Sequence, residues 1–282
     1  SLTAQTIEST LLSIDAPLPI EWPSRTSIFQ QFYNLESLHP DTFELYRKPK
    51  GKFVFDADGL SNAFDECRNL KTIPGSIFDS VQFDGNLSDF GLNRFFRKCS
   101  SLETVESGIF SNKIFASAHS CNECFSDCSA LKTIPPDLFS QVKEAIAFGG
   151  TFWGCYQLEE IPSNLFYYNT SAQAFGNCFA FCTSIKDIPR SLFSRCPEAV
   201  SFYGCFQYCS SLQSIPQDLF SGNPLVEDFE QCFSGCRSIT SAVPELWLRY
   251  PDANGKNCFA GCTNAQNWAD IPISWGGPHA EY

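Results

Sequence analysis

The sequence predicts an α/β repeat solenoid of about nine coils, each close to 27 residues long. A pattern, F-x-x-C-x-x-L-x-x-I-P-x-x-L-F, recurs along the chain and is clearest at 152–166, 179–193 and 206–220. Phenylalanine occurs 28 times and 43% of the residues are hydrophobic, which is enough to fill a long core. The position before the repeated proline recurs every 27 to 32 residues, at Ile73, Val105, Ile134, Ile161, Ile188, Ile215, Val243 and Ile271.

Each coil combines two periodicities. Phe148, Thr151, Phe152 and Cys155 stand at i, i+3, i+4 and i+7, which is the spacing of one helix face. The L-x-x-I-P segment that follows is too short for a second helix and ends at proline, so it predicts a brief strand. Successive strands would pair in parallel, about 4.8 Å apart. We therefore expect short parallel strands on a concave face and short helices on the convex face.

The repeats become irregular at both ends of the chain. A degenerate first copy contains Phe29, Phe32, Leu35 and Leu38, and the last copy has Ala265 in the leucine column. Terminal repeats of solenoids are commonly atypical because one of their faces meets solvent. The expected division is an N-terminal cap at 1–27, the solenoid at 28–275 with degenerate first and last coils, and a tail at 276–282.

The individual unit resembles a known repeat family. Segment 178–185, which reads C-F-A-F-C-T-S-I and runs into Ile188-Pro189, resembles the BspA-like leucine-rich repeats of bacterial cell-surface proteins. The resemblance implies a leucine-rich-repeat-like right-handed solenoid, export, a cell-surface or outer-membrane lipoprotein setting, and adhesion to host or neighbouring-cell proteins. The chain departs from that family in its longer unit, in its paired cysteines and in phenylalanine replacing much of the leucine.

Composition excludes several classes of partner. The formal net charge is -12 and the sequence pI is about 4.7, which argues against a nucleic-acid partner because such binders carry a concentrated cationic face. No apolar stretch approaches the roughly 20 residues that span a bilayer. We expect neither a membrane-spanning segment nor a signal segment in this chain, which opens at Ser1.

The fifteen cysteines suggest a metal site, disulfide bonds or core packing, and the separation of about 5 to 6 Å between Cβ atoms four residues apart on a helix disfavours disulfides within a coil. Eight of them form one column and five form a second column four residues earlier. Zinc sites need four ligands from paired knuckles, and the three histidines lie outside the repeat columns. We therefore expect no metal, no cofactor and no enzyme, and we interpret most cysteines as free, buried, small hydrophobic residues. The first column is Cys67, Cys99, Cys128, Cys155, Cys182, Cys209, Cys236 and Cys262; the second is Cys124, Cys178, Cys205, Cys232 and Cys258.

The middle residues of each L-x-x-I segment are the first candidate binding surface. They are short and polar, and they cannot both point into the core. Such a ladder is either a recognition surface for a protein ligand or a solvated sheet face. Its members are Lys71, Thr72, Glu103, Thr104, Lys132, Thr133, Glu159, Glu160, Lys186, Asp187, Gln213 and Ser214.

Aromatic residues outside the repeat columns offer a second surface. Tyrosine and tryptophan are prominent at protein interfaces and also stack on sugar rings, so a glycan-binding module is the alternative function. They could equally fill the spaces between coils, and a purely structural spacer domain is a third hypothesis. These residues are Trp153, Tyr156, Tyr167, Tyr168, Phe181, Tyr203 and Tyr208.

Overall fold

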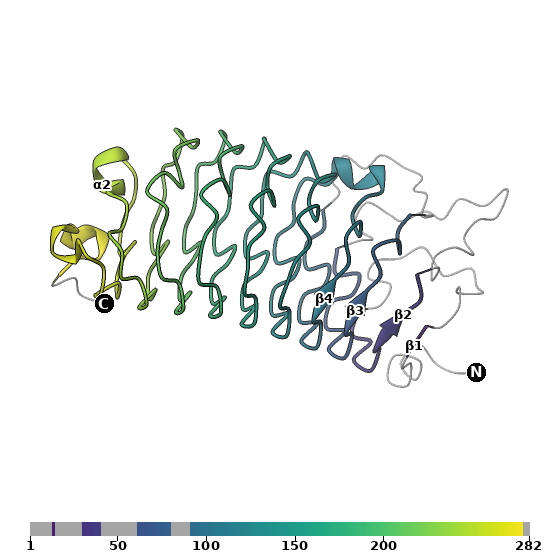
Figure 1. The fold of residues 1–282 in the computed structure, drawn as a ribbon. Helices are drawn as coiled ribbons and strands as arrows, with labels where there is room; N and C mark the ends of the chain where they lie inside the picture. The colour runs from purple at the N-terminus through teal and green to yellow at the C-terminus, as the bar shows by residue number, and fades with distance from the viewer. Residues whose placement is uncertain (1–12, 15–29, 41–60, 80–90, 279–282) are drawn as a thin grey trace.

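The chain forms a row of stacked coils that lie side by side from one end of the molecule to the other (Figure 1). The computed structural model describes residues 13–14, 30–40, 61–79 and 91–278. Most of the predicted cap at 1–27 and the end of the predicted tail lie outside these residues. The elements in chain order are β1 (Ser13–Ile14), β2 (Ser37–Leu38), β3 (Thr72–Ile73), β4 (Thr104–Val105), the 3₁₀ helix η2 (Lys113–Ser117), α2 (Leu246–Arg249), and the 3₁₀ helices η3 (Trp268–Asp270) and η4 (Ile273–Trp275).

The predicted parallel strands are present at the N-terminal end of the row. Strand β1 pairs in parallel with β2, and β3 pairs in parallel with β4, with Thr72 opposite Thr104. A further parallel bridge joins Thr104 to Thr133. Most later coils keep one backbone bond to the preceding coil, for example from the Gln213 amide to the Lys186 carbonyl at 2.9 Å, but no such bond joins Lys186 to Glu159. The L-x-x-I segments therefore stack as predicted, although most of them are too sparsely bonded to be strands.

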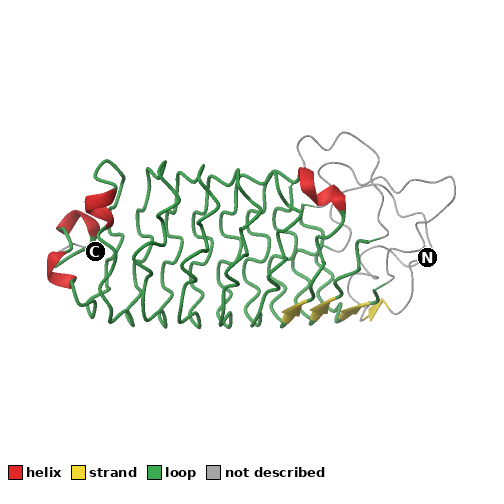
Figure 2. Cartoon of the chain, turned by 45° about the horizontal axis from the view of Figure 1, so that its top comes forward, coloured by secondary structure: helices red, strands yellow, loops and turns green. Residues whose placement is uncertain are grey.

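The predicted helices in the repeating coils are wrong. In the described residues, the F-x-x-C arms, such as 148–155, are successions of turns, and Figure 2 shows them as loops. Two positions in each arm have positive φ, a conformation that interrupts a right-handed helix. The first set is Asn62, Arg94, Glu123, Gly150, Asn177, Gly204, Gln231 and Asn257; the second is Glu66, Lys98, Asp127, Gly154, Phe181, Tyr208, Gly235 and Gly261.

Hydrogen bonds between coils explain why the arms adopt this shape. The amides of Phe148, Gly150 and Phe152 donate to carbonyls of the next arm at 2.8 Å each. The intervening peptides close turns within the arm, as in the 3.1 Å bond from the Cys155 amide to the Phe152 carbonyl. The arms on one side of the stack and the L-x-x-I segments on the other therefore have similar distances between adjacent coils, because backbone hydrogen bonds set the distance on both sides. Because the F-x-x-C arms of the described coils form turns and no helices, they do not widen one side of the stack; the predicted concave and convex faces do not develop, and the row is close to straight in both views (Figures 1 and 2).

Columns of stacked phenylalanine rings fill the core. In the central column, Phe152, Phe179 and Phe206 follow one another at ring-centroid distances of 5.4 Å with interplanar angles of 11° and 6°. A second column includes Phe166 and Phe193, whose rings are 6.0 Å apart and 11° from parallel. The rings stack because equivalent residues of adjacent coils are held in register by the backbone bonds. The predicted repeat columns are therefore confirmed as core columns.

The cysteines occupy the core between these rings. All fifteen are buried free thiols, including Cys196, which stands outside both columns. In the first column each thiol from Cys99 onward donates to the phenylalanine carbonyl of the preceding arm, as from Cys182 to Phe152 at 3.1 Å and from Cys209 to Phe179 at 3.2 Å. The Phe152 carbonyl also accepts the Cys155 amide. Cysteine thus combines a small apolar volume with a weak donor that satisfies a second lone pair of a buried carbonyl.

Buried asparagines perform a similar task at the turn after the Leu-Phe pair. The Asn223 side-chain amide donates to the carbonyls of Phe193 and Cys196 at 3.0 and 2.8 Å. Asn169, two coils before Asn223, makes the equivalent pair of bonds to the carbonyls of Phe139 and Val142. These bonds tie each turn to the preceding coil.

Replacing Asn223 by alanine is expected to lower the free energy of unfolding by about 1–3 kcal/mol, because two buried carbonyls lose their donor. Urea denaturation of the purified chain measures this loss. The control is Asn164→Ala, since Asn164 is exposed and makes no side-chain hydrogen bond to the described residues. Equal stabilities for the two variants would contradict the structural role of Asn223.

The C-terminal segment closes the last arm. The amide of Asn257 donates to the Ser274 carbonyl at 3.2 Å, and that of Phe259 donates to the Trp275 carbonyl at 2.9 Å. The Trp275 ring lies directly on Gly255, where a Cβ would approach the indole to 2.0 Å. Residues of η4 therefore replace the next coil as acceptors, which satisfies backbone donors that would otherwise be left open.

Candidate functional site

The residues of the predicted ladder lie together along one edge of the stack, which we call the strand face. Backbone bonds link them in sequence, from Lys71 to Glu36, Glu103 to Lys71, Lys132 to Glu103 and Glu159 to Lys132. Eleven of the twelve predicted site residues are exposed, and Ser214 is half-buried. The structure therefore brings the predicted residues onto one continuous surface, in two neighbouring columns.

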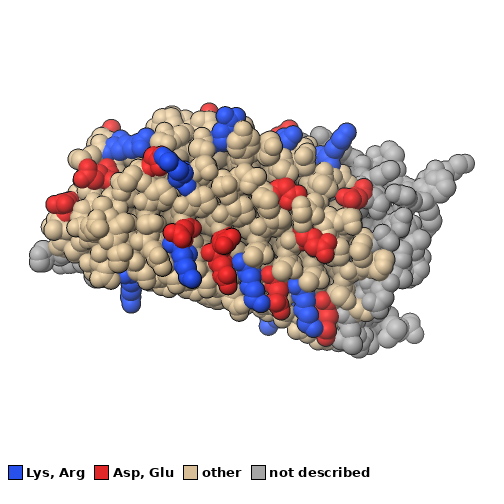
Figure 3. Space-filling model, in the orientation of Figure 1, with Lys and Arg blue, Asp and Glu red and all other residues tan. Residues whose placement is uncertain are grey.

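The first column of the strand face alternates in charge. It reads Glu36, Lys71, Glu103, Lys132, Glu159 and Lys186, and Figure 3 shows acidic and basic side chains alternating along the lower edge of the molecule. Lys71 pairs with Glu36 and Lys132 pairs with Glu103, both at 3.0 Å. Such exposed pairs contribute about 0–1 kcal/mol each, so their alternation mainly prevents repulsion between like charges.

Four charges of the strand face have no such partner. Glu159, Glu160, Lys186 and Asp187 are all exposed, and none forms an ion pair with another residue that the structure describes. Three carboxylates and one ammonium group therefore stand free on two adjacent coils. We call these four residues the acidic patch.

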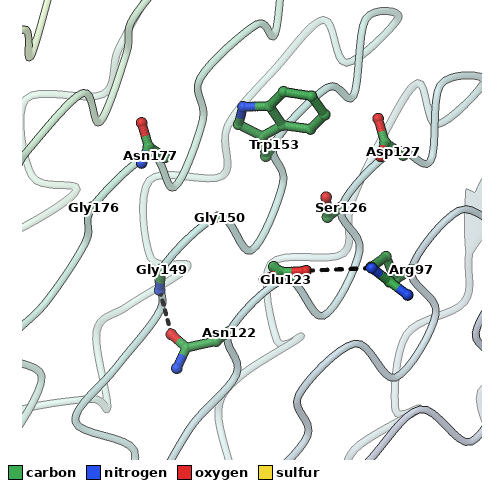
Figure 4. Close-up of a pocket in the computed structure, with 10 residues that line it drawn as sticks. All are labelled: Arg97, Asn122, Glu123, Ser126, Asp127, Gly149, Gly150, Trp153, Gly176 and Asn177. Carbon is green, nitrogen blue, oxygen red and sulfur yellow. Dashed lines mark hydrogen bonds and ion pairs between the residues drawn. The ribbon is translucent and has the colours of Figure 1, made fainter.

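A groove of about 550 Å³ opens on the arms, and none of the predicted ladder residues lines it. Figure 4 shows its lining. Its floor is formed by Gly149, Gly150 and Gly176; Gly149 and Gly176 are half-buried and stand in the column where the coil after Gly176 carries Tyr203, whereas Gly150 is buried. The indole of Trp153 also lines the groove (Figure 4). Sequence reasoning selected Trp153 as an exposed aromatic but did not place it in a groove.

Polar groups surround the groove. The Arg97 guanidinium makes two bonds to the buried Asp65 carboxylate at 2.9 and 2.8 Å, which raises the pKa of Arg97 and holds its side chain at the rim. Its other nitrogen lies 3.8 Å from Glu123, which also pairs with Arg94 at 3.0 Å. The positive charges at this end of the groove are thus already neutralised by carboxylates.

Asp127 and Asn177 stand on either side of Trp153 (Figure 4). Neither side chain makes a hydrogen bond or ion pair within the part of the chain that the structure describes. Asp127 is partly buried, and this desolvation raises the pKa of its carboxyl, against the opposing effect of the Lys98 and Arg97 charges. Within the described residues, the hydrogen-bonding capacity of these two side chains is therefore unused.

The other aromatic residues separate into different environments. Trp153, Phe181 and Tyr208 form a row on the arms, with ring centroids 5.4 and 4.9 Å apart. Tyr167 and Tyr168 lie after the Leu-Phe turn, where Arg195 covers the Tyr167 ring. Tyr208 is 41% exposed and Tyr168 is 50% exposed. Packing between coils therefore accounts for part of the predicted aromatic surface, and Trp153 is the member that lines a groove.

The described residues contain no group of three or more His, Cys, Asp or Glu side chains placed to hold a metal ion. Burial raises the pKa of Cys196 and Cys209 to about 12, so these thiols are poor nucleophiles at neutral pH. A search of the same residues for a helix long and apolar enough to cross a membrane finds none.

The sequence matches no protein-family model and no curated protein. Among solved structures, a leucine-rich repeat protein of T. pallidum shares 20% identity, covering 70% of this chain and 77% of its own, with a TM-score of 0.39. A leucine-rich cell surface protein of Faecalibacterium prausnitzii shares 18%, covering 85% and 68%, with a TM-score of 0.33. A leucine-rich repeat protein of Bacteroides ovatus shares 18%, covering 73% and 62%, with a TM-score of 0.26. Because these TM-scores are low, the evidence for the repeat architecture is the hydrogen bonds between coils and the residue columns of this chain itself.

Proposed function

We propose that this chain is a non-catalytic, exported protein that binds a protein ligand through its strand face. The observation that carries the proposal is the acidic patch of Glu159, Glu160, Lys186 and Asp187, four exposed charges on adjacent coils of a continuous polar ladder. Repeat proteins commonly bind partners with such a surface, because every coil contributes equivalent positions to it. The groups on this face bind and orient a ligand rather than transform it.

The distribution of charge along the strand face favours a partner with a basic patch. At the N-terminal end Lys71 and Lys132 are already paired with carboxylates, so a ligand gains little from them. At the acidic patch three carboxylates outnumber one ammonium group and are free to form new pairs. Complementary charges steer association and suppress wrong partners.

The dimensions of the strand face favour a macromolecule. From Lys71 to Gln213 the ladder crosses six coils, which at about 4.8 Å per step corresponds to about 25 Å. An interface of standard size between two proteins has comparable extent, whereas a small ligand needs a concave pocket. The groove on the arms is such a pocket, but the strand face is not.

The exported, cell-surface setting is part of the same proposal and is supported by the resemblance to BspA-like repeats. Protease treatment of intact cells tests it directly. Degradation of the chain without cell lysis is the expected result, and full protection that is lost only on lysis would contradict a surface location.

Neutralising the acidic patch is expected to weaken binding of a basic protein ligand strongly. In the triple variant Glu159→Gln, Glu160→Gln and Asp187→Asn the side chains keep their shape and lose their charge. Binding is measured with the purified chain on a panel of purified extracellular-matrix and cell-surface proteins. A ligand that binds the parent chain should lose most of its affinity, and parent binding should weaken as ionic strength rises from about 0.05 to 0.5 M.

The matched control is the pair Glu103→Gln and Lys132→Gln, which removes two charges from the same face outside the acidic patch. Both sets change exposed side chains, so the free energy of unfolding should move by about 0.5 kcal/mol or less. Retained binding in the triple variant, or equal loss in the control pair, would refute the assignment of the acidic patch.

A further inference from the structure

We infer that the groove around Trp153 is a second binding site, separate from the strand face, and that it takes a neutral saccharide. The arrangement that carries the inference is an indole and three glycines lining one groove, with two uncommitted polar side chains, Asp127 and Asn177, on either side of the indole (Figure 4). The site does not depend on the proposed protein ligand.

The aromatic side of the groove suits a sugar ring. One face of a pyranose is lined by C–H groups, and such a face packs against the flat surface of tryptophan. Trp153 is half-buried, and its edge is steadied by Phe181 in a T-shaped contact at 5.4 Å. Its orientation is therefore fixed before a ligand arrives, which reduces the entropy lost on binding.

The polar side of the groove suits hydroxyl groups. A carboxylate accepts hydrogen bonds and a carboxamide both donates and accepts, so Asp127 and Asn177 can pair with neighbouring hydroxyls. The side-chain oxygen of Asn122 is already occupied, since it accepts a hydrogen bond from the Gly149 amide at 2.8 Å.

The charges of the groove exclude anionic ligands. Arg97 is bound to Asp65, and Glu123 is shared between Arg94 and Arg97, so the unneutralised charge is the Asp127 carboxylate. A phosphate or a uronic acid would meet this carboxylate without a free cation to offset it. The volume of about 550 Å³ lies within the range of about 300–1,000 Å³ that is typical of small-ligand pockets and leaves room for a short oligosaccharide.

The glycine floor permits a variant that fills the groove without disturbing the core. A Cβ at Gly176 would meet its nearest neighbours, the carbonyl oxygen and Cβ of Tyr203, at the ordinary contact distances of 3.7 and 3.9 Å. Gly176 does not have positive φ, and the next coil already carries a tyrosine at the equivalent position, Tyr203. The variant Gly176→Tyr is therefore expected to fold normally with a blocked groove.

The test compares the full chain with Gly176→Tyr, Trp153→Ala and Tyr168→Ala on an array of immobilised neutral oligosaccharides, namely glucans, mannans, galactans and N-acetylglucosamine oligomers. Thermal melts followed by circular dichroism establish that each variant is folded. The expected result is that the parent chain binds at least one of these classes and that Gly176→Tyr and Trp153→Ala reduce the affinity at least about tenfold. Tyr168→Ala removes an exposed aromatic ring outside the groove and should bind as the parent does.

Two results would overturn the inference: no binding of the parent chain to any neutral oligosaccharide, or binding that survives Gly176→Tyr. Parallel spots of lysine- and arginine-rich peptides test the competing possibility that the indole and carboxylate hold a cationic side chain, and groove-dependent binding to those peptides instead of saccharides would also overturn it. The triple variant of the acidic patch should retain saccharide binding, so this result is independent of the proposed protein ligand.

Discussion

Replacing Phe179 by alanine is expected to lower the free energy of unfolding by about 3–5 kcal/mol. The Phe179 ring is fully buried and stacks on Phe152 and Phe206 at 5.4 Å on both sides, and it meets Phe166 edge-on at 6.3 Å. Removing it leaves a cavity in the middle of the central column. Because each coil contacts its neighbours in a one-dimensional stack, the loss should also weaken coupling between the two halves of the solenoid.

Calorimetry and circular dichroism melts would show this effect as a lower transition temperature and a broader or divided transition. Phe181→Ala is the matched control, since Phe181 belongs to the same arm but is only half-buried, and its loss should be clearly smaller. A melting curve for Phe179→Ala that coincides with that of the parent would show that the central column does not hold the coils together.

The repeat columns could be predicted from the sequence because the same residue types recur at one spacing, and burial follows from that recurrence. The arms could not be predicted in the same way. Spacings of three and four residues arise both from a helix and from successive four-residue turns, so Phe148, Phe152 and Cys155 fit either structure. Positive φ distinguishes the two, and glycine at 150 and 154 hints at it, but Glu123 and Phe181 occupy the same conformation without a sequence signal.

The candidate sites differ in how visible they are in the sequence. The strand-face residues follow from alignment of the L-x-x-I segments, since each coil repeats the same two exposed positions. The groove depends on side chains that are absent at Gly149, Gly150 and Gly176 and on residues drawn from different coils. The glycine pair at 149 and 150, close to Trp153, was the available signal, because the preceding coil carries Asn122 and Glu123 in the same two columns. That these glycines line a groove with Trp153 could be recognised only from the hydrogen-bond register, which sets which residues of adjacent coils lie side by side.

Raising the pH above about 9 is expected to unfold this protein cooperatively. Burial raises the pKa of thirteen thiols above the value of about 8.5 that an exposed cysteine shows, so the unfolded chain releases protons there while the folded chain keeps them. The folded state then binds more protons than the unfolded state, and stability falls as pH rises. The thirteen are Cys67, Cys99, Cys121, Cys124, Cys155, Cys178, Cys182, Cys196, Cys205, Cys209, Cys232, Cys236 and Cys262.

The expected steepness follows from the number of these groups. Each thiol removes about 1.4 kcal/mol of stability per pH unit between its unfolded and folded pKa values. For Cys196 and Cys209 this window extends from about 8.5 to about 12. Thirteen groups together would exhaust a typical net stability of about 5–15 kcal/mol within about one pH unit above the start of the window. Circular dichroism and thiolate absorbance, recorded together under reducing conditions from pH 7 to 11, should change in a single step.

A variant with Cys155, Cys182 and Cys209 replaced by alanine separates this mechanism from general alkaline damage. It is expected to show a shallower dependence of stability on pH, by about 4 kcal/mol per pH unit for three groups, even if it is less stable than the parent chain at pH 7. Unfolding that reverses on return to pH 7 would exclude covalent damage. If the thiols instead ionise near pH 8.5 while the circular dichroism signal stays folded, they are open to solvent, and the cysteines cannot be packing residues of the solenoid core.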